Sequence, residues 1–134
     1  MENKTLKNIM HFLENEENKT SFKWKLLNDK PLTKDELVVK GNLGLQFSKL
    51  TSLPEGLKVR GNLFLIRSTI ESLSEGLKVG GSLNLEHCTN LTSLPKGLEV
   101  GWELIITGSK LKKYTDDELR EMIKPGYIKG DIIR

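Results

Sequence analysis

Few residues of this chain have the types and spacing that nucleophilic or acid–base chemistry requires. Cys88 and His87 are the first candidates, because a histidine beside a cysteine can activate the thiol. Adjacent residues of an extended segment point to opposite faces, so this pair is not placed for proton transfer. The other histidine, His11, lies far away in the sequence. We therefore expect Cys88 to be a buried structural residue, since free cysteine is among the most buried residue types.

The acidic run Asp116-Asp117-Glu118 is the second candidate, because clustered carboxylates can bind a metal ion. The run follows Thr115, however, and acids in the first turn of a helix are what the helix dipole favours. Neither of the common glycine-rich phosphate-binding motifs occurs in the chain. We therefore expect a protein that is not an enzyme and that uses no metal or cofactor, with an enzyme as the residual alternative.

The segment that carries His87 and Cys88 belongs to a repeat. The segment at 53–65, LPEGLKVRGNLFL, recurs as LSEGLKVGGSLNL at 73–85 and as LPKGLEVGWELII at 94–106. A partial copy, LVVKGNLGL, precedes them at 37–45, and the fragment IKGDII follows at 128–133. Self-similarity of this period predicts structural units that bury their apolar faces by stacking on one another.

Each copy predicts one short strand. Val59, Leu63 and Leu65 alternate with other residues, which is the period-2 pattern of a strand with one buried face. The segments that return to the next strand are too short for a crossover helix, so we expect them to be extended or 3₁₀ in character. They contain residues that suit irregular turns, namely Pro54, Pro95, Gly56, Gly76 and Gly97.

Every copy contains a leucine pattern that begins with the strand leucines and reads Leu-x-Leu-x-x-Ser or Leu-x-Leu-x-x-Cys. It resembles the leucine-rich repeat consensus, and the resemblance covers residues 37–111. The Leu-Pro-x-Gly-Leu segments are similar to the short repeats of small bacterial and phage leucine-rich-repeat proteins. The resemblance implies an α/β repeat fold with a parallel sheet. The valine and glycine before the strand leucines depart from that pattern, so a horseshoe and a flatter, β-solenoid-like coil both stay open.

We expect a single domain that spans residues 1–134. It divides into an N-terminal cap at 1–31, a repeat array of about four copies at 32–113 and a C-terminal cap at 114–134. Caps are expected because the end of a stacked array must cover the apolar face of its last repeat.

The N-terminal cap is predicted to be helical over residues 4–15, where apolar residues recur with helical spacing. The stretch 22–27 begins with alternating apolar and basic residues and fits either a strand or a helix. Its alternative role is a partner-binding arm built on Phe22 and Trp24.

The C-terminal cap is predicted to be a helix followed by a strand. Thr115 and Glu118 have the spacing of a capping box, so a helix begins there, and Pro125-Gly126 ends it. The tail at 127–134 then has the pattern of a final strand.

Composition bounds the class of protein. The chain has 21 basic and 18 acidic residues, a net charge of +3, and the basic residues are scattered. A single cysteine excludes an internal disulfide framework. Met1 is not followed by a signal-peptide pattern, and no apolar run reaches the length of a membrane span. We expect a cytoplasmic protein, located in the host cell if a phage encodes it.

Binding specificity is expected at strand positions that vary between copies, because the repeat-defining residues are committed to the core. The apolar residues among them are typical of interaction sites. Trp102 replaces the glycine found at positions 41, 61 and 81, and we favour a ring that fills a gap toward the C-terminal cap over one that protrudes. The predicted partner-binding residues are Phe64, Ile66, Arg67, Asn84, Glu86, Ile105 and Trp102.

We therefore expect a noncatalytic protein–protein interaction module. The resemblance suggests a phage-encoded inhibitor that occludes a host protein, such as a defence protein or a CRISPR effector. One alternative is nucleic-acid binding along a basic stripe of Lys40, Arg60, Lys58 and Lys78. Another is a structural or self-associating repeat protein that pairs through its terminal strands.

Overall fold

The computed structural model describes residues 22–28 and 30–134, and the chain separates into two compact units, 1–36 and 37–134. The stretch that fitted either a strand or a helix is a helix, α2 (Phe22–Leu27). Within the same unit, the Lys25 ammonium forms an ion pair with the Glu36 carboxylate at 2.7 Å. The helix predicted over residues 4–15 lies outside the described residues.

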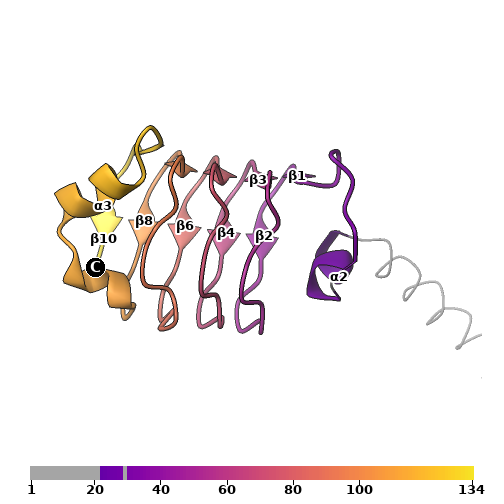
Figure 1. Cartoon of the computed structure of the whole chain (residues 1–134), viewed down its shortest axis with the longest axis horizontal. Coiled ribbons are helices and arrows are strands. Elements are labelled where there is room, and N and C mark those ends of the chain that lie inside the picture. The colour runs from indigo at the N-terminus through magenta and orange to yellow at the C-terminus, as the bar shows by residue number, and fades with distance from the viewer. Residues whose placement is uncertain (1–21, 29) are drawn as a thin grey trace, which may run out of the picture. The chain divides into compact units, whose positions relative to one another are not determined.

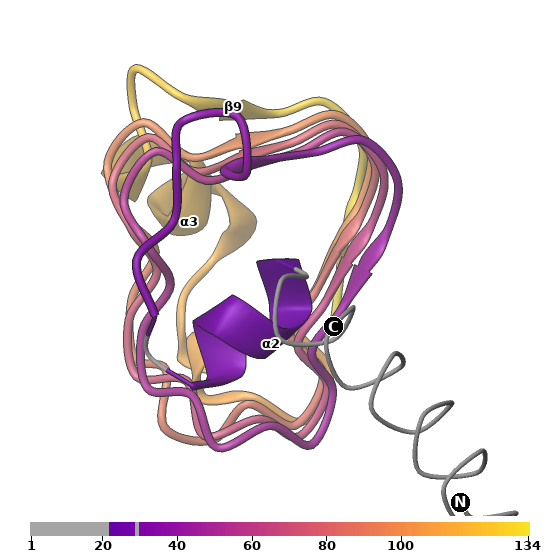
Figure 2. The same cartoon turned by 90° about the vertical axis from the view of Figure 1, so that its right-hand side faces the viewer.

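The second unit is a parallel β-solenoid, in which every coil contributes one strand to each of two five-stranded sheets (Figures 1 and 2). The first sheet contains β1 (Val38–Val39), β3 (Lys58–Val59), β5 (Lys78–Val79), β7 (Glu99–Val100) and β9 (Tyr127–Ile128). The second sheet contains β2 (Leu43–Gly44), β4 (Leu63–Phe64), β6 (Leu83–Asn84), β8 (Leu104–Ile105) and β10 (Ile132–Ile133).

This architecture confirms the predicted parallel-sheet repeat fold and corrects one detail. The sequence pattern predicted one strand per copy, whereas each coil has two. The additional strand is the Lys-Val step before the corner, where the Lys58 amide donates to the Leu37 carbonyl at 2.8 Å. A sharp corner then turns the chain into the strand of the second sheet.

The 20-residue spacing of the repeat sets the register between coils. Leu43 pairs with Leu63 and Leu63 with Leu83, so identical positions stack directly. The extra residue of the third copy is absorbed in a turn at Thr89–Asn90. Because the insertion lies in this turn and not in a strand, the register Leu83 to Leu104 is preserved.

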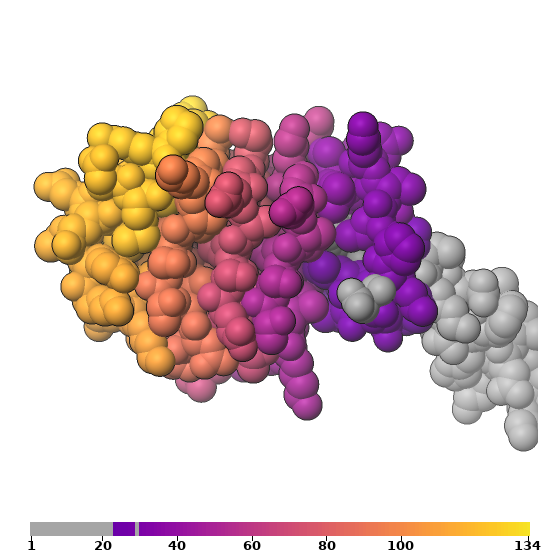
Figure 3. Space-filling view, in the orientation of Figure 1, coloured from indigo at the N-terminus to yellow at the C-terminus, as the bar shows by residue number. Residues whose placement is uncertain are grey.

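The core lies between the two sheets and consists of stacked leucine columns. Leu57, Leu77 and Leu98 are fully buried, as are Leu63 and Leu85. Each buried leucine contributes about 2 kcal/mol relative to an exposed one. In the space-filling view of Figure 3 the coils follow one another as packed bands of colour. The apolar contacts between neighbouring coils therefore hold the unit together.

Cys88 lies in this core, as expected from the sequence. Its side chain is fully buried, and its Sγ donates to the Leu65 carbonyl at 2.8 Å. The Ser68 hydroxyl of the preceding coil lies 3.7 Å from the same sulfur. Ser109 occupies the equivalent position one coil later, where its hydroxyl donates to the Ile106 carbonyl at 2.8 Å. The side chains of Cys88 and Ser109, at equivalent positions of successive coils, therefore donate hydrogen bonds to turn carbonyls inside the core.

The corners between the two sheets are tight. A Cβ at Gly80 would lie 2.3 Å from the Arg60 carbonyl oxygen of the preceding coil, so glycine is required there. Asparagine side chains bridge the corners: the Asn42 Oδ1 accepts from the Asn62 amide at 2.8 Å, and the Asn62 Oδ1 accepts from the Ser82 amide at 2.7 Å. This asparagine ladder accounts for the Gly-Asn pair in the first two copies.

A helical insertion separates the fourth coil from the fifth. It consists of the 3₁₀ helix η1 (Lys110–Lys113) and the helix α3 (Asp116–Met122), and both hydrogen bonds of the predicted capping box are present. Leu119 and Ile123 are fully buried, and the Ile123 carbonyl accepts from the Gly97 amide at 2.8 Å. Figures 1 and 2 together place α3 at the C-terminal end of the stack, across the outline of the coils.

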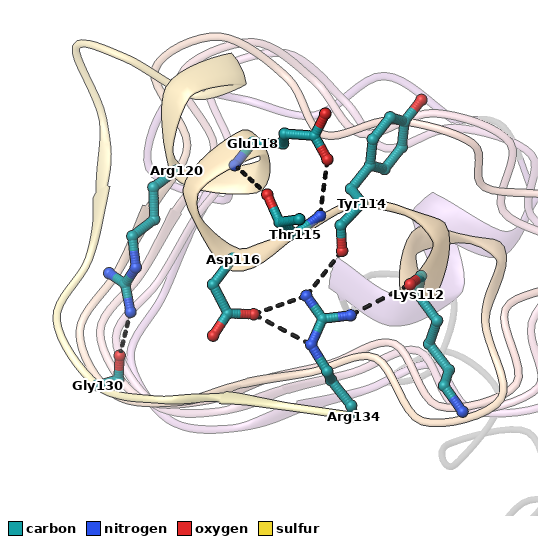
Figure 4. A network of polar contacts seen from close by, with 8 residues as sticks. All are labelled: Lys112, Tyr114, Thr115, Asp116, Glu118, Arg120, Gly130 and Arg134. Carbon is teal, nitrogen blue, oxygen red and sulfur yellow. Dashed lines mark hydrogen bonds and ion pairs between the residues drawn. The ribbon is translucent and has the colours of Figure 1, made fainter.

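Two arginines join this insertion to the last coil (Figure 4). The Arg134 guanidinium forms an ion pair with the Asp116 carboxylate at 2.7 Å and donates to the carbonyls of Tyr114 and Lys112. The Arg120 guanidinium donates to the carbonyls of Ile128 and Gly130. The predicted helix and strand are thus confirmed, and the tail supplies a strand to each sheet. Asp116, from the acidic run, is part of this connection.

Candidate functional site

Cys88 and His87, the first pair considered for catalysis, do not form a reactive pair, and His11 lies outside the described residues. Burial raises the pKa of the Cys88 thiol, which keeps the sulfur protonated and poorly nucleophilic. The His87 imidazole is turned toward the next coil, since a Cβ at Gly108 would lie 2.2 Å from its Nδ1. Within residues 22–28 and 30–134, no group of three or more histidine, cysteine or acidic side chains is placed to hold a metal ion. Over the same residues, no helix combines the length and apolar character needed to cross a bilayer.

The second sheet presents a column of apolar side chains on its outer surface. Phe64 pairs with Asn84, Asn84 with Ile105, and Ile105 with Ile133, so these four residues form one line across adjacent coils. Their strand neighbours point inward, and Leu63 and Leu104 are fully buried. We call this surface the outward face; it consists of Gly44, Phe64, Asn84, Ile105 and Ile133, with Gln46, Ile66, Glu86 and Thr107 beside them.

Two polar side chains of the outward face, those of Asn84 and Gln46, lie along its surface. The Asn84 Oδ1 accepts from the amide of Glu86 at 2.9 Å, so its side chain lies along its own strand. The Gln46 side chain covers Gly44, where a Cβ would lie 2.9 Å from the Gln46 Oε1. Phe64 and Ile105 are half-buried, and Ile133 at the end of the column is 38% exposed.

A second feature borders this face at the ends of its strands. Phe47, Arg67 and His87 adopt positive φ angles of 61°, 55° and 56°, and Gly108 follows in the same column with 70°. Each lies third in a four-residue turn, such as the one closed by the Ser68 amide and the Leu65 carbonyl at 3.0 Å. Turns of this kind favour glycine or asparagine at that position. We call Phe47, Arg67 and His87 the left-handed ridge.

The ridge carries bulky side chains at an energetic cost. A left-handed conformation costs an ordinary residue about 1–2 kcal/mol, and such strain concentrates at functional sites. Phe47 is also 69% exposed, although it is a large apolar residue. The fourth copy shows with Gly108 that the turn accepts glycine. Three bulky residues therefore occupy strained positions beside the outward face.

The structure brings most of the predicted binding residues together. Phe64, Asn84 and Ile105 share one column, and Ile66 and Glu86 lie next to it, with Arg67 on the ridge. The sequence interpretation missed Phe47 as an exposed group and Ile133 as the last member of the column. The signal for Phe47 was Gly108, whose place in the same column indicates a positive φ angle.

Trp102 lies outside this column, and the expectation that its ring fills a gap toward the C-terminal cap is wrong. It lies at the corner between the sheets and is 67% exposed, so its ring protrudes and does not fill a gap. The corner leaves no space inside: a Cβ at Gly130, the equivalent residue of the next coil, would lie 2.6 Å from the Trp102 carbonyl oxygen. Trp102 lies three residues before Ile105, at the border of the outward face.

The predicted basic stripe lies elsewhere and is interrupted. Lys58 pairs with Lys78 on the first sheet, and Lys78 pairs with Glu99 in the next coil. The Lys78 ammonium forms an ion pair with Glu99 at 2.7 Å, and its hydrogen bond holds the pKa of that carboxyl below its usual value. Lys40 and Arg60 form a second column, which continues as Gly80 and Gly101.

Comparison of the chain with protein-family models, with curated proteins and with solved structures gave no match.

Proposed function

We propose that this chain is a noncatalytic protein-binding module and that its partner binds the outward face. The observation that supports this most directly is the column Phe64, Asn84, Ile105 and Ile133, in which three apolar side chains stand in register on the solvent side of a sheet. Exposed apolar groups that cluster in this way are typical of interaction surfaces. The left-handed ridge supplies a phenylalanine, an arginine and a histidine along one border.

The rigidity of the coils also favours binding. Backbone hydrogen bonds between coils hold the carbonyls of Phe64, Asn84, Ile105 and Ile133, so little backbone entropy remains to be lost when a partner docks. The Arg67 amide, for example, donates to the Glu86 carbonyl at 2.9 Å, which continues the ladder into the ridge. A preorganised apolar surface with a charged border is the anatomy of a protein interface.

The resemblance to small phage leucine-rich-repeat proteins extends this proposal. It suggests that the partner is a host protein, and that the chain acts in the host cytoplasm by covering a surface of that protein. A defence protein or a CRISPR effector is the corresponding target class. This extension rests on analogy with the family, because a fold alone does not specify a function.

Affinity capture from host lysate tests the proposal. Phe64→Asp places a charge in the centre of the column and is expected to weaken capture by at least about 30-fold, because a central aromatic contact contributes about 2 kcal/mol or more. Lys58→Asp makes a comparable change on the outer surface of the first sheet and is the matched control. Circular dichroism and size-exclusion chromatography confirm that both variants fold.

Each outcome has a clear meaning. Loss of the partner with Phe64→Asp and retention with Lys58→Asp support the outward face. The reverse result contradicts it and favours the basic stripe. A salt titration then identifies nucleic acid as the partner, because phosphate binding weakens steeply as salt rises. Recovery of a second copy of the chain instead of a host protein indicates self-association.

A further inference from the structure

A shallow hollow lies at the corner between the fourth and fifth coils. Its volume is about 300 Å³, which is at the lower end of the range for ligand pockets. Short loops from both coils line it, and Trp102, which is 67% exposed, is one of the lining residues. The lining residues are Gly101, Trp102, Glu103, Lys129, Gly130 and Asp131.

The hollow occurs where the repeat changes its corner residues. Side-chain acceptors bridge the earlier corners, and the last of these bridges runs from the Glu103 amide to the Ser82 hydroxyl at 3.4 Å. Glu103 and Asp131 then occupy the asparagine column. Unlike the asparagines, their carboxylates form no hydrogen bond or ion pair with any residue in the described part of the chain. Both carboxylates are thus available to a ligand.

The lysine that lines the hollow, Lys129, contacts an aromatic ring and not the two carboxylates. The Lys129 ammonium lies 5.5 Å from the centroid of the Tyr127 ring, in a cation–π contact, and forms no ion pair with Glu103 or Asp131. The hollow therefore combines an exposed indole with two uncompensated carboxylates. An indole face and carboxylates together attract a cation that carries an apolar stem.

We propose that this hollow receives an arginine or lysine side chain of the partner protein. The cation would stack on the Trp102 indole. It would also donate charge-assisted hydrogen bonds to the carboxylates of Glu103 and Asp131. The hollow adjoins the outward face, because Glu103 and Asp131 each lie two residues before a member of its apolar column, Ile105 and Ile133 respectively. This inference rests on the proposed function, since one partner covers both surfaces.

Capped tripeptides test the hollow without the partner. The probes are Gly-Arg-Gly, Gly-Lys-Gly and Gly-citrulline-Gly, of which the last is neutral and nearly isosteric with the first. Binding to the full chain is followed by NMR through the Trp102 indole N–H and the amides of 101–103 and 129–131. The indole resonance is assigned with Trp102→Gly, which restores the glycine of the other corners. We expect the arginine and lysine peptides to shift these signals and the citrulline peptide to leave them unchanged.

Charge-removing variants provide the second measurement. Glu103→Gln and Asp131→Asn are each expected to weaken Gly-Arg-Gly binding about fivefold, whereas Glu75→Gln, an exposed acid of a return segment, leaves it unchanged. Equal shifts with the citrulline peptide, or no shifts in the hollow with any of the three peptides, overturn the proposal.

The two proposals fail separately. Phe64→Asp removes partner capture but not tripeptide binding. If the tripeptides fail while capture still depends on Phe64, the hollow assignment is wrong and the proposed function stands. If the tripeptides bind but no protein partner depends on Phe64, the proposed function is wrong and the cation site stands.

Discussion

Substitution of a residue of the left-handed ridge by glycine is expected to change stability and partner binding in opposite directions. Arg67 has a φ angle of 55°, and its amide and the adjoining turn are hydrogen bonded, so the backbone cannot relax. We compare Arg67→Gly with Arg67→Ala, because both remove the side chain and they differ in the cost of a positive φ. Lys58→Gly and Lys58→Ala are the reference pair, since Lys58 is an exposed strand residue without a positive φ.

The magnitude follows from two terms. Alanine at position 67 bears the left-handed cost of about 1–2 kcal/mol, which glycine does not. Glycine loses more chain entropy on folding, which costs it about 0.5–1 kcal/mol relative to alanine. At position 67 we therefore expect the glycine variant to be more stable than the alanine variant by about 0.5–1 kcal/mol. At position 58 the order is reversed by a similar amount.

Urea denaturation measures both differences as free energies of unfolding, with unchanged m-values showing that the unfolding transition is the same. If glycine is the less stable residue at position 67, as at position 58, the strain argument is refuted. Partner capture is then measured with the same proteins. We expect Arg67→Gly to bind less well than the parent chain even though its backbone is relieved of strain. Unchanged capture would remove Arg67 from the interface.

Three further predictions concern the corner, the thiol and the core. Gly80→Ala should lower the free energy of unfolding, because the new Cβ would lie 2.3 Å from the Arg60 carbonyl oxygen. Gly41→Ala should not, because a Cβ there would have no atom within 4 Å. Thermal denaturation of both variants distinguishes them. Stability should fall as pH rises above about 8.5, where the unfolded thiol of Cys88 loses its proton and the folded thiol, with its raised pKa, keeps it. Cys88→Ala should remove this pH dependence in urea titrations, and a persistent dependence would assign it to another group. Leu85→Ala should cost about 3–5 kcal/mol because the side chain is fully buried, and a loss below 1 kcal/mol by the same titrations would contradict the packing.

Local patterns in the sequence were sufficient for the repeat and for the helix and strand that end the chain. The alternation at Val59, Leu63 and Leu65 predicts which side chains face the core, because a strand has a period of two whatever surrounds it. The capping box at Thr115 is equally local, since its two hydrogen bonds join residues three positions apart. The 20-residue spacing of the strand leucines aligns identical positions of successive copies, so the parallel register could also be predicted.

The second strand of each coil could not be predicted in the same way. Lys58-Val59 is too short to show a period, and it becomes a strand because the Leu37 and Val39 carbonyls of the preceding coil accept from the amides of Lys58 and Arg60. These hydrogen bonds exist only after the coils have stacked. The conformation of the stretch 22–27 was open for a related reason, since its pattern satisfied both a strand and a helix.

The sequence by itself determined the stack: its period, its inward leucines, the buried Cys88 and the helix that begins after Thr115. Tertiary structure decided what the stack presents to solvent. It placed Phe47 in a strained and exposed turn, aligned Ile133 with Phe64, and turned Trp102 outward beside two free carboxylates. The physical reason is that core positions are specified by periodicity within the chain, whereas a surface depends on which side chains neighbouring coils bring together and on the space their backbones leave.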